Sequence, residues 1–264
     1  MSSNIHPSAI IMPGAVLGEG CEIGPFVYVG PHVKLGAGCR LHPNAMVEGH
    51  TTLGEKCEIF PFACIGGKTQ DLKWQEGNTA YVEIGERCVF REYVTVHAST
   101  TNGGKTIVGN DCCLLAYCHI AHDCIVGNRV VMSNSTHLAG HVEVGSNVVF
   151  GGMGGVAQFV RIGNYCMVGA TAKVVMDLAP FCIGDGSPLI QPVGVNKIGL
   201  ERNGFPPEKI RAILEIYKLY FRSNLRADEA IIKIREAYPV LPEAEQFVTF
   251  TQASKKGIAR PKAD

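Results

Sequence analysis

The chain of 264 residues has no excess of either charge, because 24 lysines and arginines balance 24 aspartates and glutamates. This balance argues against nucleic acid as the main partner. The sequence also has no apolar run near the ~20 residues that a membrane-spanning helix needs, so we expect no stable membrane insertion. Its start, MSSNIHPSAII, has neither a basic segment nor a long apolar core. We therefore predict no signal peptide and expect a cytoplasmic protein.

The sequence does have a strict six-residue period of inward-type apolar residues. An aliphatic residue returns at every sixth position over 5–65, and the period resumes over 84–96 and over 108–174. Neither a helix nor an ordinary strand keeps this phase. Hexapeptide repeats do so when each forms a short strand and a turn, with three faces to a coil. The pattern predicts a mainly β chain, a left-handed parallel β-helix of about nine coils.

Glycine often follows the inward residue, as in Leu35-Gly36 and Leu53-Gly54. A glycine that recurs in one register indicates a backbone position that bends where a Cβ atom would be costly.

The 11 cysteines follow the same period and therefore do not read as a disulfide or metal framework. Eight of them lie four residues after an inward aliphatic residue: Cys21, Cys39, Cys57, Cys88, Cys112, Cys118, Cys124 and Cys166. Side chains stacked on parallel strands have parallel Cβ vectors, which is poor geometry for a disulfide. We predict small, buried, free thiols, consistent with a reducing compartment.

The period divides the chain into a β-helical domain over 1–192 and a helical domain over 193–264. Insertions near 67–82 and 98–106 interrupt the rod, and such insertions leave a solenoid as loops on one face, often the binding face, although a loop without function is the alternative for each. The first contains Gln70, Asp71, Lys73 and Trp74, a mixture that suits a polar ligand with an apolar part.

In the second domain, helical spacing begins at Pro206-Pro207-Glu208, and further helices are predicted near 227–237 and 242–253. Over 196–226 the basic residues outnumber the acidic ones. Two interpretations stay open, a solvated helix face or a surface that docks an anion or an acidic protein.

The densest polar cluster on the rod contains His119, His122, His137 and His141. Residues 18 apart stack on adjacent coils, so His119 should lie against His137, and His122 should face Gly140. Neutral imidazole can act as a general base on a hydroxyl group. Histidines shared across a trimer interface could instead bind zinc, as in proteins resembling γ-class carbonic anhydrases. The zinc interpretation leaves the helical domain and the first insertion without a role, so we favour the base.

Several strings of the chain are specific: GGKTQDLK at 66–73, HIAHDC at 119–124, LAGHV at 138–142, Gly151-Gly152-Met153, Gln158-Phe159 and Gly194-Val195-Asn196. With these strings the chain resembles the UDP-N-acetylglucosamine O-acyltransferase family over almost its whole length. The resemblance implies transfer of a (3-hydroxy)acyl chain from acyl carrier protein to the 3-hydroxyl of UDP-N-acetylglucosamine, the first step of lipid A biosynthesis. It also implies a homotrimer with sites between subunits, and it implies no cofactor and no metal.

By the same resemblance, His122 is the general base, Asp123 orients its imidazole, and the N–H of Gly140 stabilises the thioester oxyanion. Ala170 takes the place of the family's acyl-chain ruler, which implies medium to long 3-hydroxyacyl chains. The remaining matched positions surround the sugar nucleotide or the acyl chain, with the last two near the nucleotide phosphates: Gln70, Asp71, Lys73, His119, His141, Gln158, Asn196 and Arg202.

The sequence departs from the family's pattern at Ala157, Ile198, Asn203 and the connector 186–191, all of which belong to the expected nucleotide and carrier contacts. These departures leave open an amino-substituted UDP-sugar acylated on nitrogen. Alternatives from other classes are a zinc enzyme of the γ-carbonic-anhydrase type and a repeat scaffold without catalysis.

Overall fold

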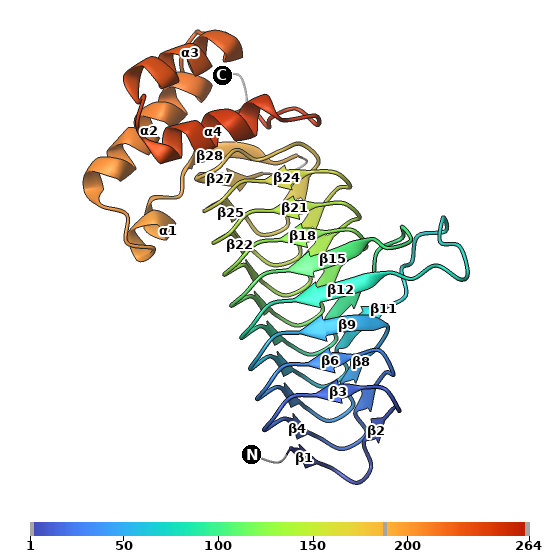
Figure 1. Cartoon of the computed structure of the whole chain (residues 1–264). Coiled ribbons are helices and arrows are strands. Elements are labelled where there is room, and N and C mark those ends of the chain that lie inside the picture. Colours follow the sequence, from blue (N-terminus) through green and yellow to red (C-terminus); the bar gives the residue numbers. More distant parts are fainter. Residues whose placement is uncertain (1–2, 187–188, 262–264) are drawn as a thin grey trace.

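A computed structural model describes residues 3–186 and 189–261 of the chain. Figure 1 shows an elongated rod of short strands with a group of helices packed across its C-terminal end and one long loop projecting from its side. The predicted parallel β-helix followed by a helical domain is confirmed.

Three sheets form the faces of the rod, and within the described residues each strand pairs in parallel with the strand one coil away, except the last pair. Sheet A contains β1 (Asn4–Ile5), β4 (Glu22–Ile23), β7 (Arg40–Leu41), β10 (Glu58–Ile59), β13 (Val89–Phe90), β16 (Cys113–Leu114), β19 (Val131–Met132), β22 (Val149–Phe150), β25 (Met167–Val168), β27 (Cys182–Asp185) and β28 (Gln191–Val195). Sheet B contains β2 (Ile10–Ile11), β5 (Tyr28–Val29), β8 (Met46–Val47), β11 (Cys64–Gly67), β14 (Thr95–His97), β17 (His119–Ile120), β20 (His137–Leu138), β23 (Gly155–Val156) and β26 (Lys173–Val174). Sheet C contains β3 (Val16–Leu17), β6 (Lys34–Leu35), β9 (His50–Leu53), β12 (Tyr81–Ile84), β15 (Lys105–Val108), β18 (Ile125–Val126), β21 (Glu143–Val144) and β24 (Arg161–Ile162).

The inward residues of the period form the core of the rod from Ile23 to Val174. The first coil is the exception: among the residues that the structure describes no further coil packs against its outer side, and Ile5 keeps 43% of its surface exposed.

The glycines that follow the inward residues are needed for a different reason than the predicted backbone bend. Gly36 does not adopt a left-handed φ, but a Cβ atom on it would lie 2.5 Å from the carbonyl carbon of Gly54 on the next coil. Close approach of successive coils therefore requires glycine here. The left-handed positions of the coils lie in the turns instead; Gly20 and Gly38 fill two of them, but many are filled by residues with side chains, including Asp123 (φ 61°) and His141 (φ 60°).

The eight cysteines in the repeat register are buried and free, as predicted. Their thiols satisfy carbonyl groups of the next coil: Cys39 donates to the Gly54 oxygen (3.2 Å) and Cys57 to the Gly85 oxygen (3.1 Å). The neighbouring Cys112 thiol, together with burial, raises the pKa of Cys88 to about 12. These thiols are structural donors in a column along the rod.

The two insertions are shorter than the interrupted period suggested. β12 begins at Tyr81 and β15 at Lys105, so the loops proper cover 68–80 and 98–104. The strands are longer here because four residue pairs of β12 and β15, beginning with Tyr81 and Lys105, continue the ladder.

The rod ends in an antiparallel pair, β27 with β28, and β28 extends sheet A past residue 192 to Val195. The helices are α1 (Lys197–Arg202), α2 (Pro207–Phe221), α3 (Ala227–Ala237) and α4 (Pro242–Gln252). The periodicity found the last three and missed α1, a six-residue helix capped by the Asn196 side chain, which accepts a hydrogen bond from Gly199 N (3.1 Å). In the part of the chain that the structure describes, no helix is long and apolar enough to cross a membrane.

Candidate active site

The turn between β17 and β18 carries His122 and Asp123 side by side. His122 is buried, with 6% of its surface exposed, and its Nδ1 lies 2.8 Å from the Asp123 Oδ2. Its other ring nitrogen, Nε2, lies 3.6 Å from the Asp71 Oδ2. One nitrogen of the imidazole is therefore held by a carboxylate while the other faces the first insertion, the arrangement that a positioned base requires.

Residues of the second insertion donate hydrogen bonds to the Asp123 carboxylate. The Ser99 hydroxyl donates a hydrogen bond to Asp123 Oδ1, and the Thr100 N–H donates to Oδ2 at 3.1 Å. The backbone N–H of Asp123 donates to the Thr106 hydroxyl at 2.9 Å. Burial alone would raise the pKa of the Asp123 carboxyl, but the hydrogen bonds from Ser99, His122 and Thr100 outweigh it and lower that pKa. Asp123 is thus an ionised and fixed partner for His122.

The sequence prediction missed Ser99 and Thr100. Ser99 lies 24 residues before Asp123. One coil is 18 residues, so the six inserted residues bring a segment of the preceding coil beside the catalytic turn. The only sign of these residues in the sequence was the interruption of the period near 98–106, and that segment is equally typical of a surface loop without function.

Gly140 stacks on His122 one coil away, as the spacing predicted. A Cβ atom on Gly140 would lie 2.3 Å from the His122 Cε1 and 2.4 Å from its Nε2. The glycine therefore leaves the room that the imidazole occupies. Within the described residues its N–H donates no hydrogen bond to another backbone group.

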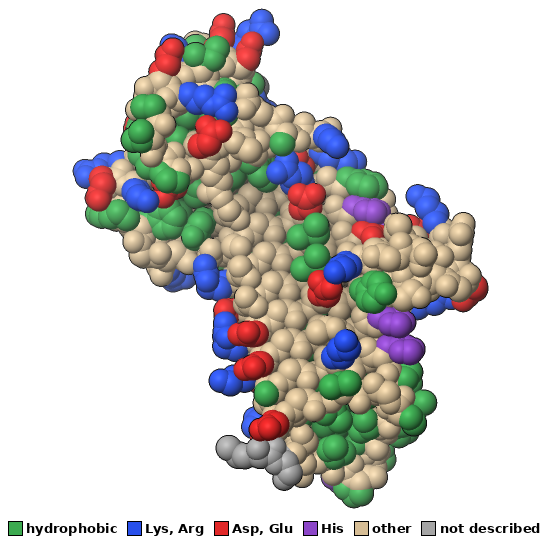
Figure 2. Space-filling model, viewed as in Figure 1, with side chains coloured by type: hydrophobic (Ala, Val, Ile, Leu, Met, Phe, Trp, Pro, Cys, Tyr) green, Lys and Arg blue, Asp and Glu red, His purple; other side chains and the backbone are tan. Residues whose placement is uncertain are grey.

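A hollow of about 530 Å³ collects most of the predicted substrate residues in front of His122. Its lining includes Gln70, Asp71, Lys73, His119, His122, Gly140 and Gln158. On the face drawn in Figure 2, most histidine side chains lie along the rod edge that carries the projecting loop. Residues 70–73 of the projecting loop form one wall of the 530 Å³ hollow, and the rod forms the other with His119, His122, Gly140 and Gln158.

Two further imidazoles line this hollow beneath His122. His119 lies in register with His137, as predicted, and its Nδ1 lies 2.7 Å from the Thr95 hydroxyl. Burial, with the neighbouring His97, His137 and His122, lowers the pKa of His119 to about 4. Burial also lowers the pKa of His97. These two rings are neutral at pH 7 and can donate or accept one hydrogen bond without adding charge.

His141 lies on the other side of the catalytic turn from the 530 Å³ hollow. Its ring stacks on Phe159 with centroids 4.6 Å apart, and its Nε2 lies 3.8 Å from the Asp123 Oδ2. His122, Asp123 and His141 offer ligand atoms within 4.8 Å of one another, a spacing that a metal ion could use. The Asp123 oxygens, however, already accept hydrogen bonds from Ser99, Thr100 and His122, so the donor set fits a positioned base better than a metal site.

Three predicted residues lie apart from this cluster within the chain. Asn196 is buried, and its side chain donates to the Tyr165 carbonyl (2.9 Å), at the turn before β25 of sheet A. Arg202 is exposed at the end of α1, and Ala170 is exposed one residue after the glycine that follows β25. His122 follows a strand of sheet B, so one chain does not bring these residues to it.

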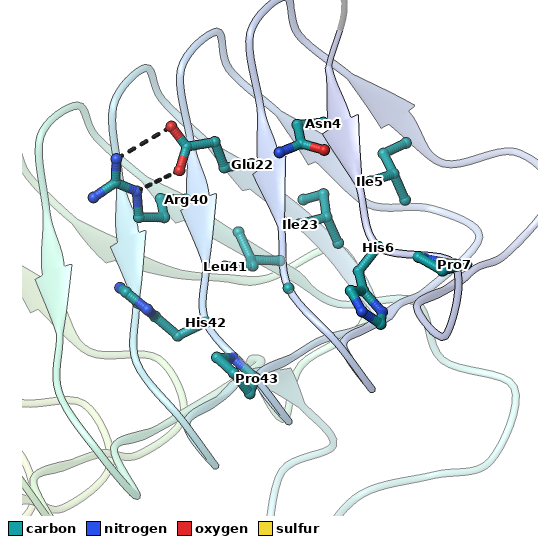
Figure 3. A pocket seen from close by; sticks show the side chains of 11 residues that line it. Asn4, Ile5, His6, Pro7, Glu22, Ile23, Arg40, Leu41, His42 and Pro43 are labelled. Atoms are coloured by element: carbon teal, nitrogen blue, oxygen red, sulfur yellow. Dashed lines mark hydrogen bonds and ion pairs between the residues drawn. The ribbon is translucent and has the colours of Figure 1, made fainter.

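A separate hollow at the N-terminal end of the rod offers no comparable chemistry. In Figure 3, Arg40 forms two hydrogen bonds with Glu22, at 2.9 and 3.1 Å, and its guanidinium also lies 3.9 Å from Glu58. His42 pairs with the same Glu58 at 2.7 Å. These charges satisfy one another across coils and are typical of a structural ladder.

Comparisons with known proteins agree over the whole chain. A family model described as UDP-N-acetylglucosamine O-acyltransferase, domain 2, matches residues 177–259. The acyl-[acyl-carrier-protein]–UDP-N-acetylglucosamine O-acyltransferase of Chlamydia caviae is 44% identical, covering 98% of this chain and 92% of that protein. Its counterpart from Thermodesulfovibrio yellowstonii is 42% identical, covering 98% and 100%. The solved UDP-N-acetylglucosamine acyltransferase of Francisella novicida superposes with a TM-score of 0.94 at 32% identity, covering 97% and 94% of the two chains.

Proposed function

The chain belongs to the UDP-N-acetylglucosamine O-acyltransferase family, and we propose that it transfers a 3-hydroxyacyl chain from acyl carrier protein to the 3-hydroxyl of UDP-N-acetylglucosamine, the first step of lipid A biosynthesis. The observation that carries the proposal is the His122 imidazole, held at Nδ1 by Asp123 and directed by Nε2 into the hollow that Gln70, Asp71 and Lys73 line.

In the proposed reaction, His122 Nε2 removes the proton of the sugar 3-hydroxyl as the oxygen attacks the thioester carbonyl carbon. Asp123 holds the proton-bearing Nδ1 and stabilises the imidazolium that forms. The carbonyl oxygen becomes an oxyanion, to which the free N–H of Gly140 donates. Collapse of the intermediate breaks the carbon–sulfur bond, and the imidazolium returns the proton to the thiolate. The products are the 3-O-acyl sugar nucleotide and the free thiol of the carrier.

The sugar is recognised by the first insertion in this proposal. Asp71 lies 3.6 Å from His122 and accepts a hydrogen bond from the backbone N–H of Lys73 (2.9 Å). Both residues line the hollow, and in this proposal their carboxylate and ammonium bind the acceptor hydroxyls. Gln158, His119 and His141 complete the contacts to the sugar and the acyl chain. Ala170 limits the acyl groove, which should accept medium to long 3-hydroxyacyl chains.

The active assembly is a homotrimer in this proposal. Support comes from the separation of Asn196 and Arg202, the expected nucleotide residues, from His122 on another face of the same rod. An exposed aromatic stripe also supports an interface between copies: Phe62, Tyr93 and Tyr117 stack along one corner of the rod with centroids 5.2 and 4.9 Å apart. A neighbouring chain would cover this stripe and bring its nucleotide residues to His122.

The direct experiment measures acyl transfer from 3-hydroxyacyl carrier protein to UDP-N-acetylglucosamine, with wild type beside His122→Ala. We expect wild-type product and a loss of about 10²-fold or more in the variant, because general-base catalysis contributes this much. Alkaline hydrolysis of the product distinguishes an ester, which cleaves, from an amide. No product with a donor of any chain length, or equal rates in both proteins, contradicts the proposal.

Mixed assembly tests the shared site. His122→Ala and Arg202→Ala trimers should each be impaired. Unfolded, mixed and refolded together, they should regain activity, because some interfaces then combine two wild-type contributions. Unchanged activity on mixing contradicts a site shared between chains.

A further inference from the structure

The catalytic turn separates two hollows, and of the residues that line the second one, the proposed reaction gives a role only to Asp123 and His141. Asp123 and His141 line the second hollow, of about 640 Å³, together with Phe159, Arg161, Lys255 and Lys256. The sugar-side residues Gln70, Asp71 and Lys73 do not line it. A transferase must bring two substrates together at one base, and this hollow lies on the sheet C side of Asp123, the partner of that base.

The two lysines stand on an anchored loop. Asp177, which is fully buried, accepts a hydrogen bond from the Ser254 hydroxyl (2.8 Å) through Oδ2 and one from the Arg161 N–H (2.8 Å) through Oδ1. Its backbone N–H donates to the Gly257 carbonyl (2.9 Å), and its carbonyl accepts from the Ala259 N–H (2.8 Å). The loop is thus fixed to the rod on both sides of Lys255 and Lys256. A ligand that binds these cations therefore does not lose affinity through the ordering of a flexible loop.

A continuous set of contacts joins this loop to the base. The Lys256 ammonium lies 5.6 Å from the centroid of Phe159, which stacks on His141. His141 in turn lies 3.8 Å from the carboxylate that holds His122. A ligand group beside Lys256 would therefore lie in the same hollow as Asp123, the partner of His122.

The charged side chains that line the hollow have a net charge of +1, because three cations, Arg161, Lys255 and Lys256, face two carboxylates, Glu143 and the ionised Asp123. Glu143 pairs with Arg161 at 3.2 Å. Within the described residues, Lys255 and Lys256 form no salt bridge, and both are exposed. Two free ammonium groups on a fixed loop are suited to a phosphate group, which Lys binds as a point charge.

We propose that Lys255 and Lys256 form a phosphate-binding site beside the catalytic turn, which takes a phosphate of one of the two substrates. This inference rests on the proposed function, in which both substrates carry phosphate: the sugar nucleotide as a diphosphate, and the carrier as the phosphodiester of its thioester-bearing arm. The site holds that phosphate while the reacting group reaches His122.

The test compares wild type with Lys255→Gln/Lys256→Gln, and uses Lys34→Gln/Lys233→Gln as a control that removes the same charge from exposed lysines of β6 and α3. Inorganic pyrophosphate is titrated into each protein by calorimetry at low ionic strength. We expect about 10-fold weaker binding in the first variant only, since hydrogen bonds to charged groups are worth this much. Equal binding in all three proteins, or no binding to wild type, overturns the site whether or not acyl transfer occurs.

Kinetics then identify the source of the phosphate. A rise of about 10-fold in KM for UDP-N-acetylglucosamine alone assigns the sugar nucleotide, and the same rise for the acyl carrier alone assigns the carrier. The kcat should stay within about threefold of wild type, because neither lysine contacts the reacting atoms in the proposed mechanism. Unchanged KM for both substrates, or a fall in kcat alone, overturns the proposal. If wild type transfers no acyl group, the proposed function fails while the pyrophosphate titration still decides the site.

Discussion

Gly140→Ala should disable the base without removing it. The added Cβ atom would lie 2.3 Å from the His122 Cε1 and 2.4 Å from its Nε2, whereas an ordinary contact begins near 3.4 Å. The ring must therefore move by about 1 Å, away from the 2.8 Å contact that joins it to Asp123. A displacement of this size in a reacting group costs about 10²-fold in rate, or nearly 3 kcal/mol of transition-state stabilisation.

The substitution isolates this effect from two others. Gly140 does not occupy the left-handed φ region, so alanine is compatible with its backbone, and alanine keeps the N–H proposed for the oxyanion. Gly155→Ala is the matched control on the same rod, because a Cβ atom there would meet nothing within 4 Å. We expect the control to keep the wild-type kcat and melting temperature.

The assay is the initial rate of acyl transfer at saturating substrates, with circular dichroism to verify folding. Gly140→Ala should lose about 10²-fold in kcat while its KM values stay near those of wild type. A folded Gly140→Ala protein with kcat within threefold of wild type would refute the reasoning, because the imidazole would then have another functional position.

Three other predictions follow from contacts around the same rod. Asp123→Asn should lower kcat by about 10²-fold or more, because an amide can donate to Nδ1 and leave the wrong nitrogen protonated; near-wild-type turnover would exclude Asp123 as the orienting group. Because the pKa of His119 is lowered from 6.5 to about 4 in the folded state, the contribution of His119 to the free energy of unfolding is fully present above pH 6.5 and is lost as the pH falls towards about 4. Between pH 7 and pH 5, the free energy of unfolding in urea should therefore fall by about 1 to 2 kcal/mol more in wild type than in His119→Gln, after allowance for the partial exposure of His119. His6→Gln should behave as wild type, and equal falls in all three proteins would contradict the prediction. A thiol reagent should label no more than the two partly exposed cysteines, Cys64 and Cys113, in the native protein and all 11 after denaturation, whereas rapid labelling of five or more would show that the cysteine column is accessible.

The rod follows from local periodicity. Each hexad contributes one inward residue, and stacking identical units buries a continuous core, so the spacing alone places His119 on His137 and His122 beneath Gly140. The cysteine column follows for the same reason, because the register of a residue decides its burial. Resemblance of short strings to a known family added the residue roles, which periodicity cannot supply.

What the sequence by itself determined is the coil, its register and the face on which the histidines gather. Only the tertiary structure decided how the irregular segments meet that face: Ser99 behind Asp123, Asn196 as a helix cap bound to Tyr165, and Lys256 over Phe159. The physical reason is that a repeat residue is positioned by its neighbours at fixed spacing. A loop or tail is positioned by hydrogen bonds and packing with residues distant in sequence, such as Asp177 with Ser254, and no local period encodes those contacts.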